Sequence, residues 1–475
     1  MTVAALSAQS RPEQTLWVAA LGILLCFVNA STLNVALPVV AREIHASPLQ
    51  ASWILLIYML VASVLILVFG RVGDLLGRRN VYLCGLTLLT VASVGCAVAW
   101  NIQSLLVMRA LQAVGAAAII TNTSALIADV FPRSRLAAGL GTIATISALA
   151  QGLGPLMGGA LVEWVGWRVL FLLNLPMGVI GIWAAFRVLE RKPQRSAGSF
   201  DWTGSVLSAL AIGAWVYGLS VGGVYGWTDA RVMGALCVGG IGGLAFVLSQ
   251  KSLPHPLLDL SLFKNRTRAI AYLGILLVCM AQTASIVLAA LFLQGVQGLD
   301  TATAGLHVVP LAIGMAIGSA VSVRWLRVRP ATTVSGNGSA LCALGLGLIA
   351  ATLGPQTSSI VLGAGLLLTG LGLGTFIPPN TSTIMEGVSP QQRGVCNGVR
   401  STAMNLGFLL GATCSLTLAT MDLLPMAQRA AFAGELRLLA NDQVTGFING
   451  CTEVFSLLAL LCAGVALLMW RVDQR

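Results

Sequence analysis

Charged residues are scarce in this chain. Asp, Glu, Lys and Arg make up 9% of its 475 residues, whereas hydrophobic residues make up 57%. A soluble domain needs roughly a quarter of its residues charged to cover its surface, so the composition argues against a water-soluble protein. Three histidines, and ten cysteines without a C-x-x-C or His/Cys ligand spacing, indicate neither a zinc site nor a disulfide framework. We predict no metal and no cofactor.

Motifs of catalysis and of nucleotide-driven transport are also missing. The sequence has no G-x-x-x-x-G-K-[ST] loop and no soluble domain to hold one. No Ser/His/Asp grouping points to a hydrolase. We therefore predict that the protein is not an enzyme, and a membrane-embedded enzyme or sensor stays as the remote alternative.

Long runs without charge are what the sequence does contain. A hydrocarbon core of about 30 Å needs roughly 20 apolar residues per helix. The segment 330–385 is long enough for two spans, with a turn at 354–359, and twelve further runs bring the prediction to fourteen transmembrane helices in an all-α membrane protein. These twelve runs are 14–41, 44–70, 80–108, 110–128, 136–162, 169–186, 202–228, 232–250, 269–299, 301–323, 401–421 and 454–470.

The net charge of +11 is spread over the loops on one side of these spans. Lys and Arg are enriched in cytoplasmic loops of membrane proteins, so the pattern predicts a multi-pass protein of the cytoplasmic membrane with both termini in the cytoplasm. A nucleic-acid site would gather basic residues on one domain, and none does. The first run is long enough to span, so we predict a retained helix rather than a signal peptide.

Two polar loops divide the chain. "LERKPQRSAGSFDW" follows the sixth predicted span and "KSLPHPLLDLSLFKNRTR" follows the eighth. We predict an N-terminal six-helix bundle over 1–190, a two-helix insert with its flanking loops over 191–268, and a C-terminal six-helix bundle over 269–475. Two six-helix halves are typical of a duplicated transporter, and we predict that it works as a monomer.

Charged groups near or within the spans are candidates for function. In "GRVGDLLGRRN", 70–80, Asp74 lies among Arg71, Arg78 and Arg79, which predicts a charge latch or, alternatively, a plain positively charged turn. Arg109 lies about five residues inside the fourth span; buried arginines there are costly and usually functional, although this one could instead reach the headgroups.

Amides and small residues within the spans are further candidates. Gly154 and Gly158, with Pro155 between them, predict a close, bendable helix contact. Glu453 lies either at mid-membrane or at the interface. The uncharged candidates for substrate contact are Gln112, Asn122, Gln151, Gln282, Asn380 and Asn405.

Taken together, these motifs resemble the fourteen-span drug:proton antiporter branch of the major facilitator superfamily. The resemblance covers essentially the whole chain. It rests on "GRVGDLLGRRN", "RALQAVGAAA", "GLGPLMGG", "WRVLFLLNLPMG", "FDWTG" and "LFLQGVQGLDTATAGLHVVPLAIG", which occur in the expected order.

The resemblance implies two bundles that rock around a central cavity. Asp74 and Arg78 would form a latch between the bundles with Asp129, and Arg109 would line the cavity and take part in proton coupling. Gly154, Pro155 and Gly158 would seal the bundle interface in one state.

The first span departs from the family pattern D-x-T-I-V-N-V-A-L-P. Here the stretch reads "NASTLNVALP", with Asn29 at the aspartate position, while Asn34 and the helix-ending Pro38 match. An amide cannot titrate, so the usual coupling group is missing and a cationic substrate is disfavoured. Asn29 lies about 20 Å deep at 1.5 Å per residue, at a depth similar to that of Arg109.

We predict a secondary active exporter of small drug- or antibiotic-type organic molecules, coupled to protons through alternating access. A proton-independent facilitator and a narrow-substrate metabolite exporter are the alternatives. The expected partners are a small-molecule substrate, protons and the lipid bilayer.

Overall fold

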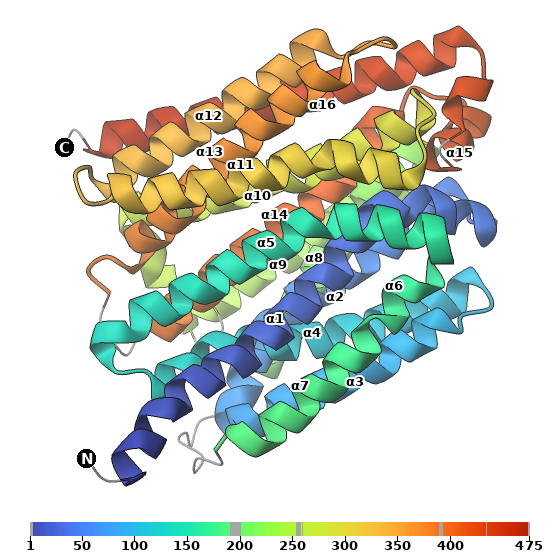
Figure 1. Ribbon diagram of the computed structural model, residues 1–475. Coiled ribbons are helices and arrows are strands. Elements are labelled where there is room, and N and C mark those ends of the chain that lie inside the picture. Colours follow the sequence, from blue (N-terminus) through green and yellow to red (C-terminus); the bar gives the residue numbers. More distant parts are fainter. Residues whose placement is uncertain are drawn as a thin grey trace.

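In a computed structural model of the chain, the described residues form helices joined by turns and short loops. The structure describes residues 3–190, 201–252, 258, 260–388, 393–433 and 435–473. The long helices run side by side (Figure 1), and α1 begins and α16 ends at one end of the molecule, here called the terminal end. At the opposite, distal end, α1 ends and α11 begins.

The helices are α1 Val3–Glu43, α2 Pro48–Leu76, α3 Arg78–Ala97, α4 Ile102–Val130, α5 Arg133–Val165, α6 Arg168–Leu172, α7 Asn174–Val188, α8 Trp202–Tyr225, α9 Ala230–Ser252, α10 Arg266–Gly295, α11 Thr301–Trp325, α12 Ala331–Thr352, α13 Ser359–Met385, α14 Arg393–Thr420, α15 Pro425–Ala433 and α16 Asn441–Asp473, with 3-10 turns η1 Leu260–Lys264 and η2 Leu436–Leu438.

Thirteen stretches within the described residues are long and apolar enough to cross a membrane. The predicted all-α membrane class is therefore confirmed. The span predicted at 136–162 is not among the thirteen; it lies on α5, where the side chains of several residues fall outside the described part of the chain.

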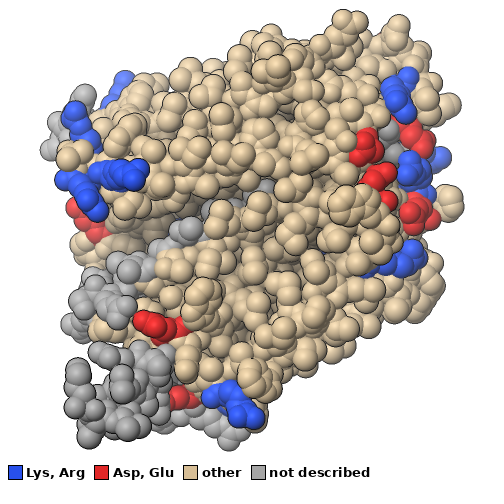
Figure 2. Space-filling view, viewed as in Figure 1, with Lys and Arg blue, Asp and Glu red and all other residues tan. Residues whose placement is uncertain are grey.

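The surface agrees with a bilayer around the helices. In Figure 2, Lys, Arg, Asp and Glu gather at the two ends of the molecule and leave an uncharged band between them. Large apolar side chains such as Trp183, Ile241 and Leu460 are exposed on the outside. Lipid tails accept such a surface, whereas water does not.

Polar residues in the loops set several of the helix starts. The first backbone N–H groups of a helix have no partner within the helix, and a side-chain oxygen just before it can accept them. Ser47 caps α2 and Asn101 caps α4, each in a reciprocal capping box, and Asp300 caps α11.

Two helices differ from the sequence prediction at or near a proline. Pro38 does not end the first helix, because α1 continues to Glu43. The run 169–186 is split into α6 and α7 at Leu173. Pro176 explains this split: it has no N–H to donate to the Leu172 carbonyl and fits best in the first turn of a new helix.

Helix packing arranges the chain around its middle. In the first half, α1–α7, α1 packs on α5, and α4 packs on α2 and α3; in the second half, α10–α16, α13 packs on α11 and α12, and α10 on α14. The pairs α5–α11 and α2–α14 join the halves. The helices α8 and α9 pack on each other, and α8 also packs on α2 and α14.

Candidate functional site

A cavity lies between the two halves, midway along the helices. It is lined from α1, α2, α4 and α5 on one side and from α10 and α14 on the other. The lining residues are Cys26, Phe27, Ala30, Ser31, Asn34, Tyr58, Met59, Ala62, Ile120, Gln151, Gln282, Thr283, Ile286, Asn405 and Phe408.

Four of the amides singled out in the sequence line this cavity: Asn34, Gln151, Gln282 and Asn405. Gln282 Nε2 donates a hydrogen bond of 3.0 Å to Gln151 Oε1, and this bond joins α10 to α5 across the two halves. Asn405 Nδ2 donates to the Ser401 carbonyl of its own helix at 2.8 Å. The remaining lining is apolar apart from small hydroxyls, the thiol of Cys26 and the phenol of Tyr58.

Arg109 does not line the cavity. Its side chain is buried within the first half, with 1% of the residue exposed, so it does not reach the headgroups. Nε donates to the Ile54 carbonyl at 3.3 Å, and a terminal nitrogen donates to Gln112 Oε1 at 3.1 Å. The guanidinium lies 4.5 Å from the centre of the Tyr58 ring and 6.0 Å from that of Phe171. Tyr58 thus stands between this charge and the cavity.

Asn29 and Gln112 belong to the same buried cluster. Asn29 Oδ1 accepts from Gln112 Nε2 at 3.4 Å and from Asn174 Nδ2 at 3.0 Å. Both donors also reach the Ser93 hydroxyl oxygen, at 2.7 Å and 3.2 Å. Among the described residues, no carboxylate forms an ion pair with Arg109. The positive charge is therefore held by neutral groups and aromatic rings.

Asn174 and Ser93 were missed as members of this cluster. The signal for Asn174 was present, since it is the polar residue in "FLLNLP", but that stretch was used only as a family motif. Ser93 carries no such signal, because serines inside apolar helices commonly bond to their own backbone.

Two other predicted residues lie away from the cavity. Asn380 of α13 is buried and donates to the Ala271 carbonyl of α10 at 3.1 Å. Glu453 is on an exposed face of α16. The structure does not bring either of them to the cavity wall.

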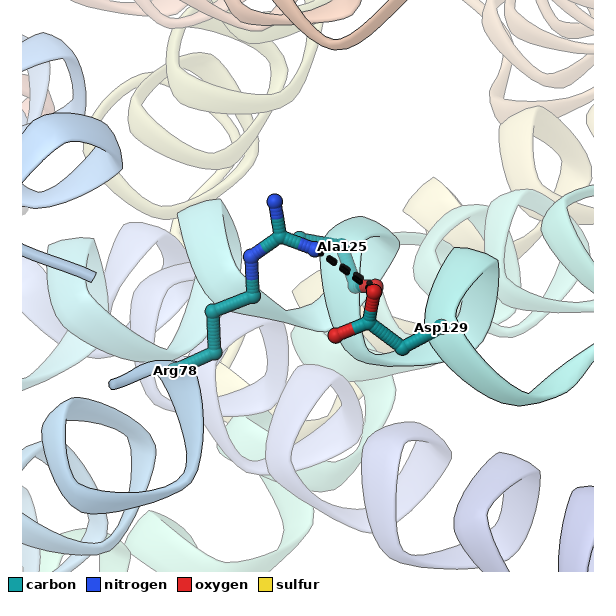
Figure 3. A network of polar contacts seen from close by, with 3 residues as sticks. All are labelled: Arg78, Ala125 and Asp129. Atoms are coloured by element: carbon teal, nitrogen blue, oxygen red, sulfur yellow. Dashed lines mark hydrogen bonds and ion pairs between the residues drawn. The ribbon is translucent and has the colours of Figure 1, made fainter. Parts of the chain in front are cut away.

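The predicted latch is described in part. Arg78 lies at the start of α3 and donates to Asp129 Oδ1 at 3.0 Å and to the Ala125 carbonyl at 3.3 Å, both near the end of α4 (Figure 3). These three residues belong to the first half. The side chain of Asp74, the third predicted member, is outside the described residues.

The glycines of α5 face two different neighbours. Methyl groups at Gly154 and Gly158 would overlap Ser31 and Thr32 of α1, which belongs to the same half, so these two glycines do not face the other bundle as expected. The contact with the second half comes from the next face of the helix. A methyl group at Gly159 would overlap the Thr301 backbone, and one at Gly305 of α11 would lie 2.6 Å from the Pro155 carbonyl oxygen.

Polar contacts also join the halves toward the distal end. Gln294 Nε2 of α10 donates to the Val35 carbonyl of α1 at 2.9 Å. Arg42, at the end of α1, lies 3.7 Å from Glu435. Together with the α5–α11 glycine contact, these bonds hold the halves together on the distal side of the cavity.

Comparison with known proteins gives a consistent family. The chain is 31% identical over 399 residues to the multidrug resistance protein Stp of Mycobacterium tuberculosis, which covers 84% of this chain and 74% of that protein. It is 28% identical over 412 residues to the tetracenomycin C resistance and export protein of Streptomyces glaucescens, covering 85% and 75%.

The human organic anion transporter MFSD10 (TETRAN) has the same fold, with a TM-score of 0.61 and 17% identity over 95% of this chain and 99% of that structure. The sequence profile of the Major Facilitator Superfamily matches residues 19–412. With most of its length matched, and with a cavity lined by helices of both halves, the chain belongs to the Major Facilitator Superfamily.

Proposed function

We propose that this protein is a secondary active exporter of small organic molecules across the cytoplasmic membrane. The observation that carries the proposal is the cavity at mid-depth, which both halves line and which contacts on its distal side close. Such a cavity can open alternately to either side when the halves rock against each other. The names of the relatives, a multidrug resistance protein and an antibiotic resistance and export protein, support export as the direction and drug-like molecules as the cargo.

The proposed architecture has fourteen spans, six in each of 1–190 and 269–475 and two in the insert over 191–268. A chain that starts and finishes at the same end must cross an even number of times (Figure 1). The helix α5 has 33 residues and packs on both α1 and α11. If α5 is counted with the thirteen candidate spans, the total is fourteen. We place the terminal end in the cytoplasm, in accordance with the excess of Lys and Arg in its loops, and we propose a monomer because one chain encloses its cavity.

Protons are the coupling ion in this proposal, because the span-two, span-four and span-five motifs resemble those of drug:proton antiporters. The cavity wall itself offers no described carboxylate, and Asn29 cannot titrate. The coupling proton would then bind away from the wall. The same absence favours the second candidate function, a facilitator that moves its substrate down a gradient without protons.

Transport in vesicles of purified protein separates these functions. A panel of drug-like compounds would be measured with and without an imposed pH gradient. Accumulation against a gradient that requires the pH difference supports the antiporter. Equilibration that ignores the pH difference supports the facilitator, and no movement of any compound by folded protein overturns the proposal.

A further inference from the structure

Two residues of the cavity wall each carry a side-chain oxygen without a hydrogen-bond donor among the described residues. Asn34 Oδ1 and Gln282 Oε1 are both buried, and neither has a partner among the described residues. Asn34 is 5% exposed and Gln282 1% exposed, and both line the cavity. Leaving a buried acceptor without a donor is unfavourable, so each oxygen favours a ligand that can donate to it.

The orientation of Gln282 follows from its neighbours. Gln151 Nε2 donates to the Ser147 carbonyl at 3.3 Å, and a carbonyl can only accept. The side-chain oxygen of Gln151 is therefore the acceptor toward Gln282, and the side-chain nitrogen of Gln282 is the donor. This chain of bonds leaves the oxygen of Gln282, and not its amide N–H, as the unpaired atom in the cavity wall.

The charges around the cavity restrict the ligand further. No described lining residue is an Asp, Glu, Lys, Arg or His, so a charged ligand would meet no opposite charge. In the first half, the guanidinium of Arg109 lies 4.5 Å from the centre of the ring of Tyr58, which lines the cavity. This positive charge opposes a cation in the cavity, and no carboxylate in the described part of the chain pairs with it.

We infer that the substrates of this cavity are uncharged, largely apolar molecules that carry hydroxyl or amide N–H donors, and that Asn34 and Gln282 select for those donors. This inference rests on the proposed export function and names its substrate class. The aromatic and aliphatic lining, including Phe27, Ile286 and Phe408, suits the apolar body of such a molecule. Lipophilic cations are poor substrates for the same wall.

The test compares three probes with one ring system: 9-phenanthrol, its methyl ether 9-methoxyphenanthrene, and the 9-phenanthryl trimethylammonium ion. The ether matches the phenol but has no donor. Binding is measured by equilibrium dialysis with the full-length protein in lipid nanodiscs, and partition into empty nanodiscs is subtracted. Water can satisfy the two oxygens before binding, but an ether that displaces it leaves them unpaired, whereas the phenol replaces its hydrogen bond.

We expect the phenol to bind about five- to tenfold more tightly than the ether. The cation, which also has no donor, should bind about tenfold more weakly than the ether because of its charge. Gln282→Leu and Asn34→Leu should each reduce the preference for the phenol. Asn122→Ala is the matched control, because Asn122 is a buried amide that donates to Ala118 of its own helix, away from the cavity wall. It should leave the preference unchanged.

Equal binding of phenol and ether by the wild-type protein overturns the inference, and so does tighter binding of the cation than of the ether. Neither result depends on a variant folding. A full preference retained in both leucine variants, with wild-type melting temperatures, also overturns it. Vesicle transport separates the inferred substrate class from the proposed export function. Export of the probes without a donor preference refutes the substrate class alone, whereas no export of any compound refutes the proposed function.

Discussion

Two adjacent glycines of α5, Gly158 and Gly159, allow a direct test of whether the contact between the halves on the distal side of the cavity belongs to one conformational state. Gly159→Ala places a methyl group against the Thr301 backbone of α11, in the other half of the molecule. Gly158→Ala places one against Thr32 of α1, in the same half. If the halves rock as rigid units, the first overlap exists only while the distal side is closed, and the second exists in every state.

The size of the effect follows from the atoms involved. Both methyl groups would meet backbone atoms, which cannot rotate away as a side chain can. Overpacking of this kind costs typically about 1–3 kcal/mol. Applied to one conformational state only, that cost lowers its population relative to the open state by about 5- to 150-fold. Applied to both states, it lowers the free energy of unfolding and leaves their ratio unchanged.

The assay is a distance measurement between spin labels at the distal end. Trp100, after α3, and Leu438, in η2, are 80% and 72% exposed and lie in different halves. Both would be changed to cysteine in a chain whose exposed Cys84 and Cys237 are replaced by serine. Conditions are chosen in which the parent protein populates the short distance.

We expect Gly159→Ala to move population from the short to the longer distance, and Gly158→Ala to lower the melting temperature without moving it. An unchanged distance distribution in Gly159→Ala would refute the assignment of this contact to one state. Equal shifts in both variants would refute the rigid movement of α1 with α5.

Four further changes have defined outcomes. Asp129→Asn removes a partly buried ion pair with Arg78, so we expect impaired transport kinetics; normal kinetics would exclude a latch. Arg109→Ala should abolish export and Arg109→Lys should not restore it, because one ammonium cannot bond as the guanidinium does; vesicle export measures both. Asn29→Asp should gain export of cationic dyes, in a pH-dependent manner, compared with wild type. The Thr303 backbone N–H and hydroxyl hold the pKa of Asp300 below its usual range, so this cap stabilises the fold above about pH 4 and loses that effect as the pH falls through the lowered pKa. Asp300→Ala should therefore cost about 1 kcal/mol at neutral pH, and the melting temperatures of the two proteins should converge in acid.

The helical membrane class could be predicted from the sequence because it follows from composition alone. Charges cannot enter hydrocarbon without cost, so the helices lie close to the uncharged runs. The predictions that were wrong concern where individual helices end. The runs do not show that α1 continues past Pro38 or that α6 ends at Leu172, since both depend on how neighbouring backbone groups are satisfied.

The site could be predicted by residue type and depth, but not by direction. Amides at mid-membrane were the right kind of residue, and Asn34 and Gln282 do reach the cavity. Arg109 belongs to the same buried cluster as Asn29 but points into its own half. A helix that is apolar on all sides gives no periodic signal for its rotation, so the sequence cannot tell a residue that faces the cavity from one that faces a neighbouring helix. The same ambiguity applies to Gly158 and Gly159, which lie about 100° apart around α5.

The amide at position 29 now has a physical explanation. Asn29 Oδ1 accepts two amide N–H groups, and one of these belongs to Gln112, whose own oxygen accepts from Arg109. Gln112 therefore links the arginine to the asparagine through hydrogen bonds, and no negative charge faces the guanidinium within this link. With a carboxylate at position 29, the cluster would hold a buried ion pair in the place of this neutral relay, and the arginine's field at Tyr58 would be largely cancelled. With an amide the field persists at Tyr58, where it would add to the preference of the proposed cavity for uncharged substrates.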